Sequence, residues 1–272
     1  MPAHLGYPLH GDKYWNTAYY RFFYGAKEAF LKISRGWQSR PMATVVRRYN
    51  PEGNDRIQIN SICCDSAFLG NPIDPIFMDR SWFARNMILP YLILEPDYTW
   101  VVDTGGGVVG YLTASVTPVF GYLRAYMVAT NVLLELIPNY VLGKYDHHPR
   151  SKRFAEFVIT NGLSQIPRHP QNAAHFHFNI HKDYRGQGLG KRLLGVFEES
   201  LSSRGIERYY AEVMSSPTWR PEPYFTRLGY EIYDKVKTTV FEPEVEDLYV
   251  LCVIRDLTLV PRQGEGNALS DF

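Results

Sequence analysis

A short glycine-rich segment constrains this chain more than any other feature. It reads HKDYRGQGLGKRLL at residues 181–194, with an apolar stretch before it and a helical pattern after it. Gly186, Gly188 and Gly190 alternate with single residues. Because glycine has no Cβ, such a backbone can form left-handed turns and approach a ligand closely. The segment therefore predicts a strand, a tight turn and the N-terminus of a helix.

A turn of this kind is a candidate site for an anion. Free backbone N–H groups and the positive end of the helix dipole both attract phosphate. Arg185 and Lys191 flank the glycines and can add formal charge. The segment therefore predicts a binding site for a phosphate or pyrophosphate group.

The spacing of the glycines excludes one familiar phosphate site and leaves two alternatives. Gly186 and Gly190 enclose three residues, whereas a Walker A loop encloses four, and Arg192 stands where its magnesium-binding hydroxyl belongs. A dinucleotide-binding fingerprint remains an alternative, with Lys191 in place of its third glycine and Glu212 as its ribose-binding acid. A structural turn that holds no ligand is the other alternative.

The composition limits the class of protein. The 272 residues include 29 basic and 28 acidic side chains, and a formal net charge of +1 argues against a nucleic-acid-binding protein. A hydrophobic fraction of 45% is enough for a sizeable core. Three cysteines, two of them adjacent, imply no disulfide framework. With no signal-peptide pattern at the N-terminus, we expect a cytoplasmic protein.

The hydrophobic pattern divides the chain into three parts. We expect residues 1–42 to be an aromatic-rich, helical extension and residues 261–272 to be a disordered tail. Residues 43–260 form the main domain, with a long insert at 117–172. The pattern of the insert predicts helix as far as Tyr145 and loops beyond it.

Two segments bear on membrane association. Residues 119–142 are the most apolar, but Arg124, Glu135 and Pro138 interrupt them, so we expect no stable membrane insertion. The extension at residues 1–42 is basic as well as aromatic. It is expected to pack on the main domain, with docking on a membrane surface or a partner as the alternative.

The main domain combines strands and helices in an irregular order. Strands are predicted at 43–48, 98–103, 108–116, 173–180, 207–214, 230–240 and 248–257, and helices at 54–68, 81–94, 187–204 and 221–228. The glycines at 105–107 predict a hairpin turn, and the last two strands an antiparallel pair. The order predicts an α/β fold with a mixed sheet, since a doubly wound parallel fold would alternate strictly.

The glycine-rich turn and its context resemble one enzyme superfamily. Arg185, Gly188 and Gly190 meet the pattern [RQ]-x-x-G-x-[GA], and a short aromatic helix ending in Leu-Gly-Tyr follows further on. The segment resembles the GNAT superfamily of acyl-CoA-dependent N-acyltransferases. AHFHFNIHKDYRGQGLGKRLL is similar to a microbial subgroup with a His-x-His fourth strand and to the acetyltransferase-like domain of O-GlcNAcases. PYLILEPDYTWVVDTGGGVVGYLTAS resembles the second and third strands of that subgroup.

The resemblance implies a fold and a reaction. The implied fold is a mixed, mostly antiparallel central sheet of six to seven strands, flanked by helices and splayed at the acyl-CoA site. The implied reaction moves an acetyl group from acetyl-CoA to a primary amine, expected to be a small molecule, in a ternary complex. Fourth-strand backbone groups would bind the pantetheine, and amides of the turn the pyrophosphate. The implied acetyl-CoA-binding residues are Phe178, Asn179, Ile180, His181, Arg185, Gly186, Gln187, Gly188, Leu189, Gly190 and Lys191.

The strand before the turn offers candidates for a general base. His175, His177, Asn179 and His181 alternate with apolar residues, so a period of two places the polar side chains on one face. Histidine titrates near neutral pH, which makes His177, and after it His175, the candidate base. As alternatives, these histidines only form hydrogen bonds with the insert, or His175 and His177 chelate a metal. Since no third ligand pattern accompanies them, we expect no metal.

The candidate general acid departs from the family pattern. The family often places a tyrosine four residues before the glycine of a terminal Gly-Phe/Tyr pair. Counting back from Gly229 gives Phe225, and Tyr224 lies one position away, a rotation of about 100° on a helix. Tyr224 is the candidate acid, and Trp219 a candidate for the acceptor pocket. The departure leaves a catalytically silent acyl-CoA-binding or sensor module as an alternative. Assembly into a homodimer also remains an alternative to a monomer.

Overall fold

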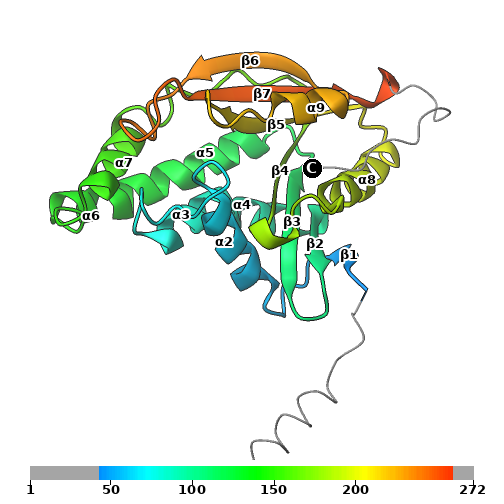
Figure 1. The fold of residues 1–272 in the computed structure, drawn as a ribbon, viewed down its shortest axis with the longest axis horizontal. Helices are drawn as coiled ribbons and strands as arrows, with labels where there is room; N and C mark the ends of the chain where they lie inside the picture. The colour runs from blue at the N-terminus through cyan, green and yellow to red at the C-terminus, as the bar shows by residue number, and fades with distance from the viewer. Residues whose placement is uncertain (1–42, 260–272) are drawn as a thin grey trace, which may run out of the picture. The chain divides into compact units, whose positions relative to one another are not determined.

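The computed structural model describes residues 43–259 (Figure 1). The expectations for residues 1–42 and 261–272 lie outside the described residues. The described part contains a seven-stranded sheet with helices on both faces, which confirms the predicted α/β class.

The sheet is mixed and mostly antiparallel, as predicted. In space its strands follow the order β1-β2-β3-β4-β5-β7-β6. Their bounds are β1 Val45–Arg48, β2 Thr99–Asp103, β3 Val108–Ser115, β4 Ala174–Ile180, β5 Arg208–Ser215, β6 Glu231–Lys237 and β7 Tyr249–Asp256. Neighbouring strands run antiparallel except β4 and β5, which run parallel.

The helices fall close to the predicted ranges outside the insert. Their bounds are α2 Asp55–Ser66, α3 Arg80–Met87, α4 Leu89–Leu94, α5 Phe120–Asn131, α6 Ile137–Val141, α7 Pro149–Thr160, α8 Leu189–Ser202 and α9 Glu222–Arg227. A π-helical turn, η2 Val132–Leu136, joins α5 to α6, and short 3₁₀ turns occupy η1 Pro96–Tyr98, η3 Lys182–Tyr184 and η4 Leu257–Leu259. The predicted helix at 81–94 is interrupted at Ile88, and Pro90 then lies in the first turn of α4, where no N–H donor is needed.

One expectation about the insert was wrong. The segment after Tyr145 is not loop-rich throughout, because α7 occupies Pro149–Thr160. Pro149 starts the helix, and the His148 ring caps it by accepting a hydrogen bond from the Ser151 amide. Phe154 and Ala155 lie on its buried face. The basic residues between these apolar positions obscured the helical period in the sequence.

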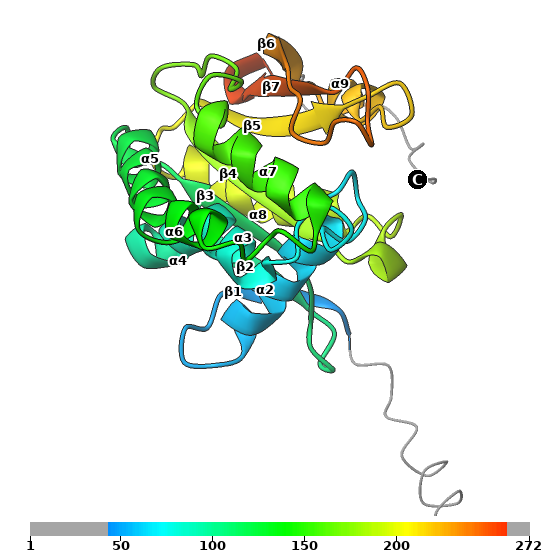
Figure 2. The same ribbon diagram turned by 90° about the vertical axis from the view of Figure 1, so that its left-hand side faces the viewer.

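Two apolar layers enclose the sheet. Helix α8 packs on one face of β2–β5, and α2 with α4 covers the opposite face of β2 and β3 (Figures 1 and 2). The α8 layer includes Leu189, Leu193, Leu194, Phe197, Leu201, Phe176 and Tyr209. The α2 layer includes Ile59, Ile62, Cys63, Ile88, Leu92, Val101 and Tyr111. A further cluster joins α3 and α7 with the loop after β6.

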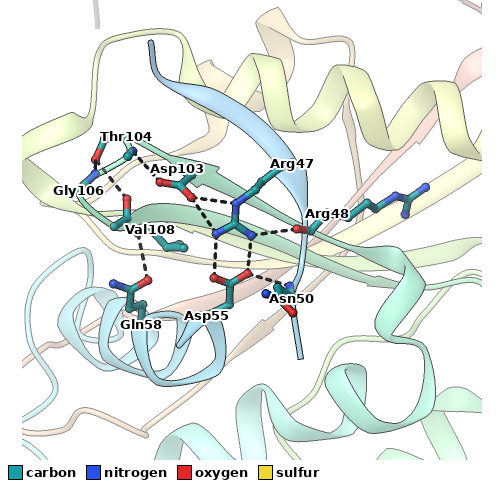
Figure 3. A network of polar contacts seen from close by, with 11 residues as sticks. Arg47, Arg48, Asn50, Asp55, Gln58, Asp103, Thr104, Gly106 and Val108 are labelled. Carbon is teal, nitrogen blue, oxygen red and sulfur yellow. Dashed lines mark hydrogen bonds and ion pairs between the residues drawn. The ribbon is translucent and has the colours of Figure 1, made fainter. Parts of the chain in front are cut away.

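A partly buried ion-pair network fixes the edge of the sheet (Figure 3). The guanidinium of Arg47 on β1 donates to both carboxylate oxygens of Asp55 at 2.6 and 2.9 Å and to Asp103 on β2 at 2.8 Å. The amide of Asn50 also donates to Asp55, at 2.8 Å. Burial alone would raise the pKa of Asp55, but these hydrogen bonds lower it. The network ties β1, α2 and the β2–β3 hairpin together.

The central irregularity of the sheet lies between its two parallel strands. β4 and β5 pair only at Ala174 with Tyr209 and at His175 with Tyr210. In Figure 1, β5, β6 and β7 lie across the top, steeply inclined to β2, β3 and β4. The two strands therefore separate after His175, as the resemblance implies for an acyl-CoA site.

Candidate active site

A cleft of about 1910 Å³ opens where β4 and β5 separate. On the α8 face it is lined by Gly186, by residues 188–191 and by α9. On the other face it is lined by the histidines of β4, by β5 and by side chains of α5 and α7. The cleft therefore joins the glycine-rich turn to a polar chamber under the insert.

The glycine-rich turn leaves its amides open. Gly186 and Gly188 have φ of 75° and 70°, in the left-handed region that glycine tolerates best. Gly188 precedes α8, and the amide of Arg192 is the first in this stretch to bond back, to the Gly188 carbonyl. Among residues 43–259, no group accepts a hydrogen bond from the amides of residues 186–191. These donors, with the N-terminus of α8, form a candidate anion site that no side chain of residues 43–259 caps.

Arg185 and Lys191 differ in how they relate to this site. Arg185 donates through its guanidinium to the carbonyls of Ile180 and Gly70, both at 3.0 Å, and to the Ser66 hydroxyl at 3.2 Å. Burial lowers the pKa of Arg185. It therefore fastens the turn to α2, with one hydrogen bond from each of its three nitrogens, whereas Lys191 is exposed at the cleft.

The backbone of β4 presents only alternate residues to the gap. The amide of His181 donates to the Val109 carbonyl on β3 at 2.8 Å. Since hydrogen-bonding direction alternates along a strand, the backbone of Asn179 also faces β3. Phe178 and Ile180 then direct their amides toward the space left by β5. Of the β4 residues expected at the pantetheine, these two have backbone donors that face the gap.

The polar face of β4 is buried and hydrogen-bonded. Nδ1 of His175 lies 2.7 Å from the Tyr91 hydroxyl, and Nδ1 of His177 lies 3.2 Å from the Tyr111 hydroxyl. Asn179 donates to the same Tyr111 hydroxyl at 3.0 Å. Burial lowers the pKa of His175 to about 3 and that of His177 to about 4. Both imidazoles are therefore neutral near pH 7.

His181 lies apart from this group. Its Nδ1 accepts from the Asp183 amide at 3.4 Å and caps the short turn η3. The predicted polar face thus brings together three of the four residues, and the chain bends before the fourth.

A charged cluster that the sequence reasoning missed faces the histidines across the gap. Glu212 on β5 accepts from Nε2 of His169 at 3.0 Å, and Nη1 of Arg124 lies 3.9 Å from its other oxygen. The His175 ring lies 4.7 Å from the ring of Tyr210, two positions before Glu212. Burial would raise the pKa of Glu212, but His169 and Arg124 lower it to about 2. The one available sequence signal was a lone arginine in an otherwise apolar helix.

The aromatic pair on α9 divides between core and cleft. Phe225 is buried and its ring lies 5.2 Å from that of Tyr230. The Tyr224 hydroxyl lies over the first turn of α8, 3.2 Å from where a Cβ on Gly190 would stand. Burial raises the pKa of Tyr224. The one-residue offset therefore directs the tyrosine toward the glycine-rich turn, whereas the phenylalanine packs against Tyr230.

Trp219 closes the cleft from the loop before α9. Its ring lies 2.7 Å from where a Cβ on Gly70 would stand, so it packs directly on that glycine.

No group of three or more potential ligands capable of holding a metal occurs within residues 43–259. None of the helices in the same range has both the length and the apolar content that a bilayer-crossing segment needs.

Comparisons with known proteins agree with this geometry. A family model described as the Acetyltransferase (GNAT) family matches residues 152–230, from α7 through the turn to the end of α9. The crystal structure of SsHAT is similar over 79% of this chain and 98% of its own, with 24% identity and a TM-score of 0.50. Ard1 from Thermoplasma volcanium covers the same shares with 12% identity and a TM-score of 0.46. The comparison with curated proteins found no match.

The family match and the fold define the class of protein. Residues 152–230 match the GNAT acetyltransferase family, and the described residues have a fold similar to that of SsHAT, with a mixed sheet that opens between β4 and β5. The dinucleotide-binding alternative is excluded, because that fingerprint belongs to a doubly wound parallel sheet.

Proposed function

We propose that this chain transfers an acetyl group from acetyl-CoA to the primary amine of a small molecule. The observation that carries the proposal is the gap between β4 and β5, with the open amides of residues 186–191 at its end. Those amides and Lys191 would bind the pyrophosphate. The amides of Phe178 and Ile180 would pair with the pantetheine as an added strand does.

The reaction would take place in one ternary complex. The neutral amine attacks the thioester carbonyl carbon, a C–N bond forms, and the C–S bond breaks to release the thiolate of CoA. An amide on β4 that faces the gap would donate to the carbonyl oxygen as negative charge develops there. No covalent intermediate on the protein is needed.

Two side chains would move the protons. His177 is the candidate base for the amine proton, with His175 beside it. Because the pKa of His177 is lowered to about 4, it would pass the proton on to solvent and not retain it. Tyr224 is the candidate acid for the thiolate. Burial raises its pKa, so its hydroxyl stays protonated at neutral pH, as a proton donor must.

The insert supports a small acceptor. Phe120 and Arg124 of α5, with Phe154 and Phe157 of α7, line the chamber on the histidine side of the sheet. An acceptor would enter under these helices and meet the thioester in the gap.

The direct test is CoA thiol release with acetyl-CoA and a panel of primary amines, with the N-acetylated product identified by mass spectrometry. We expect amine-dependent thiol release and a matching product. Phe225, buried where the family often has its tyrosine, favours a silent acyl-CoA-binding module as the second candidate. Saturable acetyl-CoA binding without thiol release across the whole panel would establish that second candidate.

A further inference from the structure

The arginine on the insert helix is placed as a ligand-binding group. Arg124 lies on α5 four residues after the buried Phe120, so both side chains lie on the inner face of that helix. Its side chain is 24% exposed and lines the cleft beside Tyr91 and Tyr210. A charged group is thus carried to the acceptor chamber by a helix that is otherwise almost entirely apolar.

The guanidinium of Arg124 lacks the partners that such a group needs. Within the described part of the chain, none of its N–H groups donates a hydrogen bond, and its Nε is shielded from solvent as well. The nearest opposite charge, Oε2 of Glu212, is 3.9 Å from Nη1, beyond hydrogen-bonding distance. Because a buried, unpaired donor is costly, a missing acceptor is expected at this position.

The neighbours of Arg124 define what that acceptor is. Glu212 already accepts from His169 and presents a second carboxylate oxygen close to the guanidinium. A positive and a negative group therefore stand side by side in the same chamber. A ligand with an ammonium and a carboxylate close together matches both: its ammonium lies by Glu212, and its carboxylate can make a bidentate contact with Arg124.

We infer that the acceptor amine carries a carboxylate beside it, as a free amino acid does, and that Arg124 binds this carboxylate. The inference rests on the proposed N-acetyltransferase function and assigns its substrate class. Glu212 holds the incoming ammonium next to the histidines of β4 before the amine loses its proton. A peptide or protein amine has no adjacent carboxylate and leaves the N–H groups of Arg124 without an acceptor.

The test compares amines that differ only in the carboxylate. Suitable sets are phenylalanine with phenylalaninamide and 2-phenylethylamine, alanine with ethylamine, and lysine with 1,5-diaminopentane. We expect kcat/KM to be at least about tenfold higher for the carboxylate member of at least one set, which corresponds to about 1.4 kcal/mol. Arg124→Gln removes that preference, chiefly by raising the KM of the amino acid, and Arg124→Lys retains part of it. Arg56→Gln, an exposed position on α2 outside the cleft, retains all of it.

Calorimetry on the same proteins measures their acetyl-CoA affinity. This measurement distinguishes a failure of the acceptor inference from a failure of the proposed function. If wild type and Arg124→Gln bind acetyl-CoA equally, a lost preference reflects the acceptor site and not a damaged fold. The inference is overturned if the members without a carboxylate are used equally well in every set, or if the preference survives in Arg124→Gln. It is also overturned if acetyl-CoA binds but no amino acid is acetylated or bound. Failure to bind acetyl-CoA would instead overturn the proposed function itself.

Discussion

The left-handed turn before α8 allows a substitution whose two effects can be calculated separately. Gly188 has a φ of 70°, and a Cβ built on it meets no atom within 4 Å. Gly188→Ala therefore causes no clash within the described protein, and its cost is the strain of a left-handed backbone, about 1 kcal/mol. For a domain of this size, that strain lowers the melting temperature by about 2–4 °C.

The effect of Gly188→Ala on ligand binding is predicted to be larger. The added methyl group stands in open space beside the turn whose amides, in residues 186–191, are proposed to bind the pyrophosphate. A hydrogen bond to a charged group contributes about 1.5–3 kcal/mol. Loss of one such bond weakens acetyl-CoA binding by about 10- to 100-fold.

Gly229→Ala is the matched control. Gly229 follows α9 with a φ of 80°, it is absent from the lining of the cleft, and a Cβ there has ordinary contact with Arg255 at 3.9 Å. It should lose similar stability and keep its acetyl-CoA affinity. Calorimetric titration and thermal unfolding of both variants provide the two readouts. If Gly188→Ala loses no more affinity than Gly229→Ala, the glycine-rich turn is not the pyrophosphate site.

Three further predictions follow from the contacts described above. Asp55→Asn removes one of the two carboxylate partners of Arg47 and should destabilise the fold by about 2–3 kcal/mol in urea unfolding at pH 7, less than for a fully buried pair because Arg47 is partly exposed and keeps Asp103. Because the folded-state pKa of Asp55 is lowered, its contribution is present at neutral pH and is lost as the pH falls through that pKa, so wild type and variant should converge in acid. Tyr224→Phe should lower kcat for thiol release by about 100-fold and leave acetyl-CoA affinity unchanged, and an unchanged kcat would remove Tyr224 as the acid. The contribution of His177 to kcat/KM, corrected for ionisation of the amine, should be lost only below about pH 4, and a loss near pH 6.5 would show that its pKa is not lowered.

The periodic elements of the fold were predictable because their signals are local. A period of two in residues 173–180 and a helical period in residues 187–204 gave β4 and α8 within a few residues. The glycines between them predicted a turn with positive φ, which Gly186 and Gly188 adopt. The mixed character of the sheet followed from the irregular order of strands and helices.

The tertiary pairings were not predictable from such patterns. Nothing local in Arg185 indicates that its guanidinium is used by Ser66 and Gly70, which are distant in sequence. The meeting of Arg124 with Glu212 across the gap depends on how the insert folds back over the sheet. Sequence reasoning therefore predicted the glycine-rich side of the cleft more completely than the chamber under the insert.

The most direct test of the central claim is a crystal structure of this protein with acetyl-CoA. The account predicts pyrophosphate oxygens within about 2.7–3.2 Å of amides in residues 186–191. It also predicts the pantetheine alongside Phe178 and Ile180, with the thioester in the gap between β4 and β5. Acetyl-CoA bound elsewhere, with those amides still free and the gap empty or closed, would contradict it.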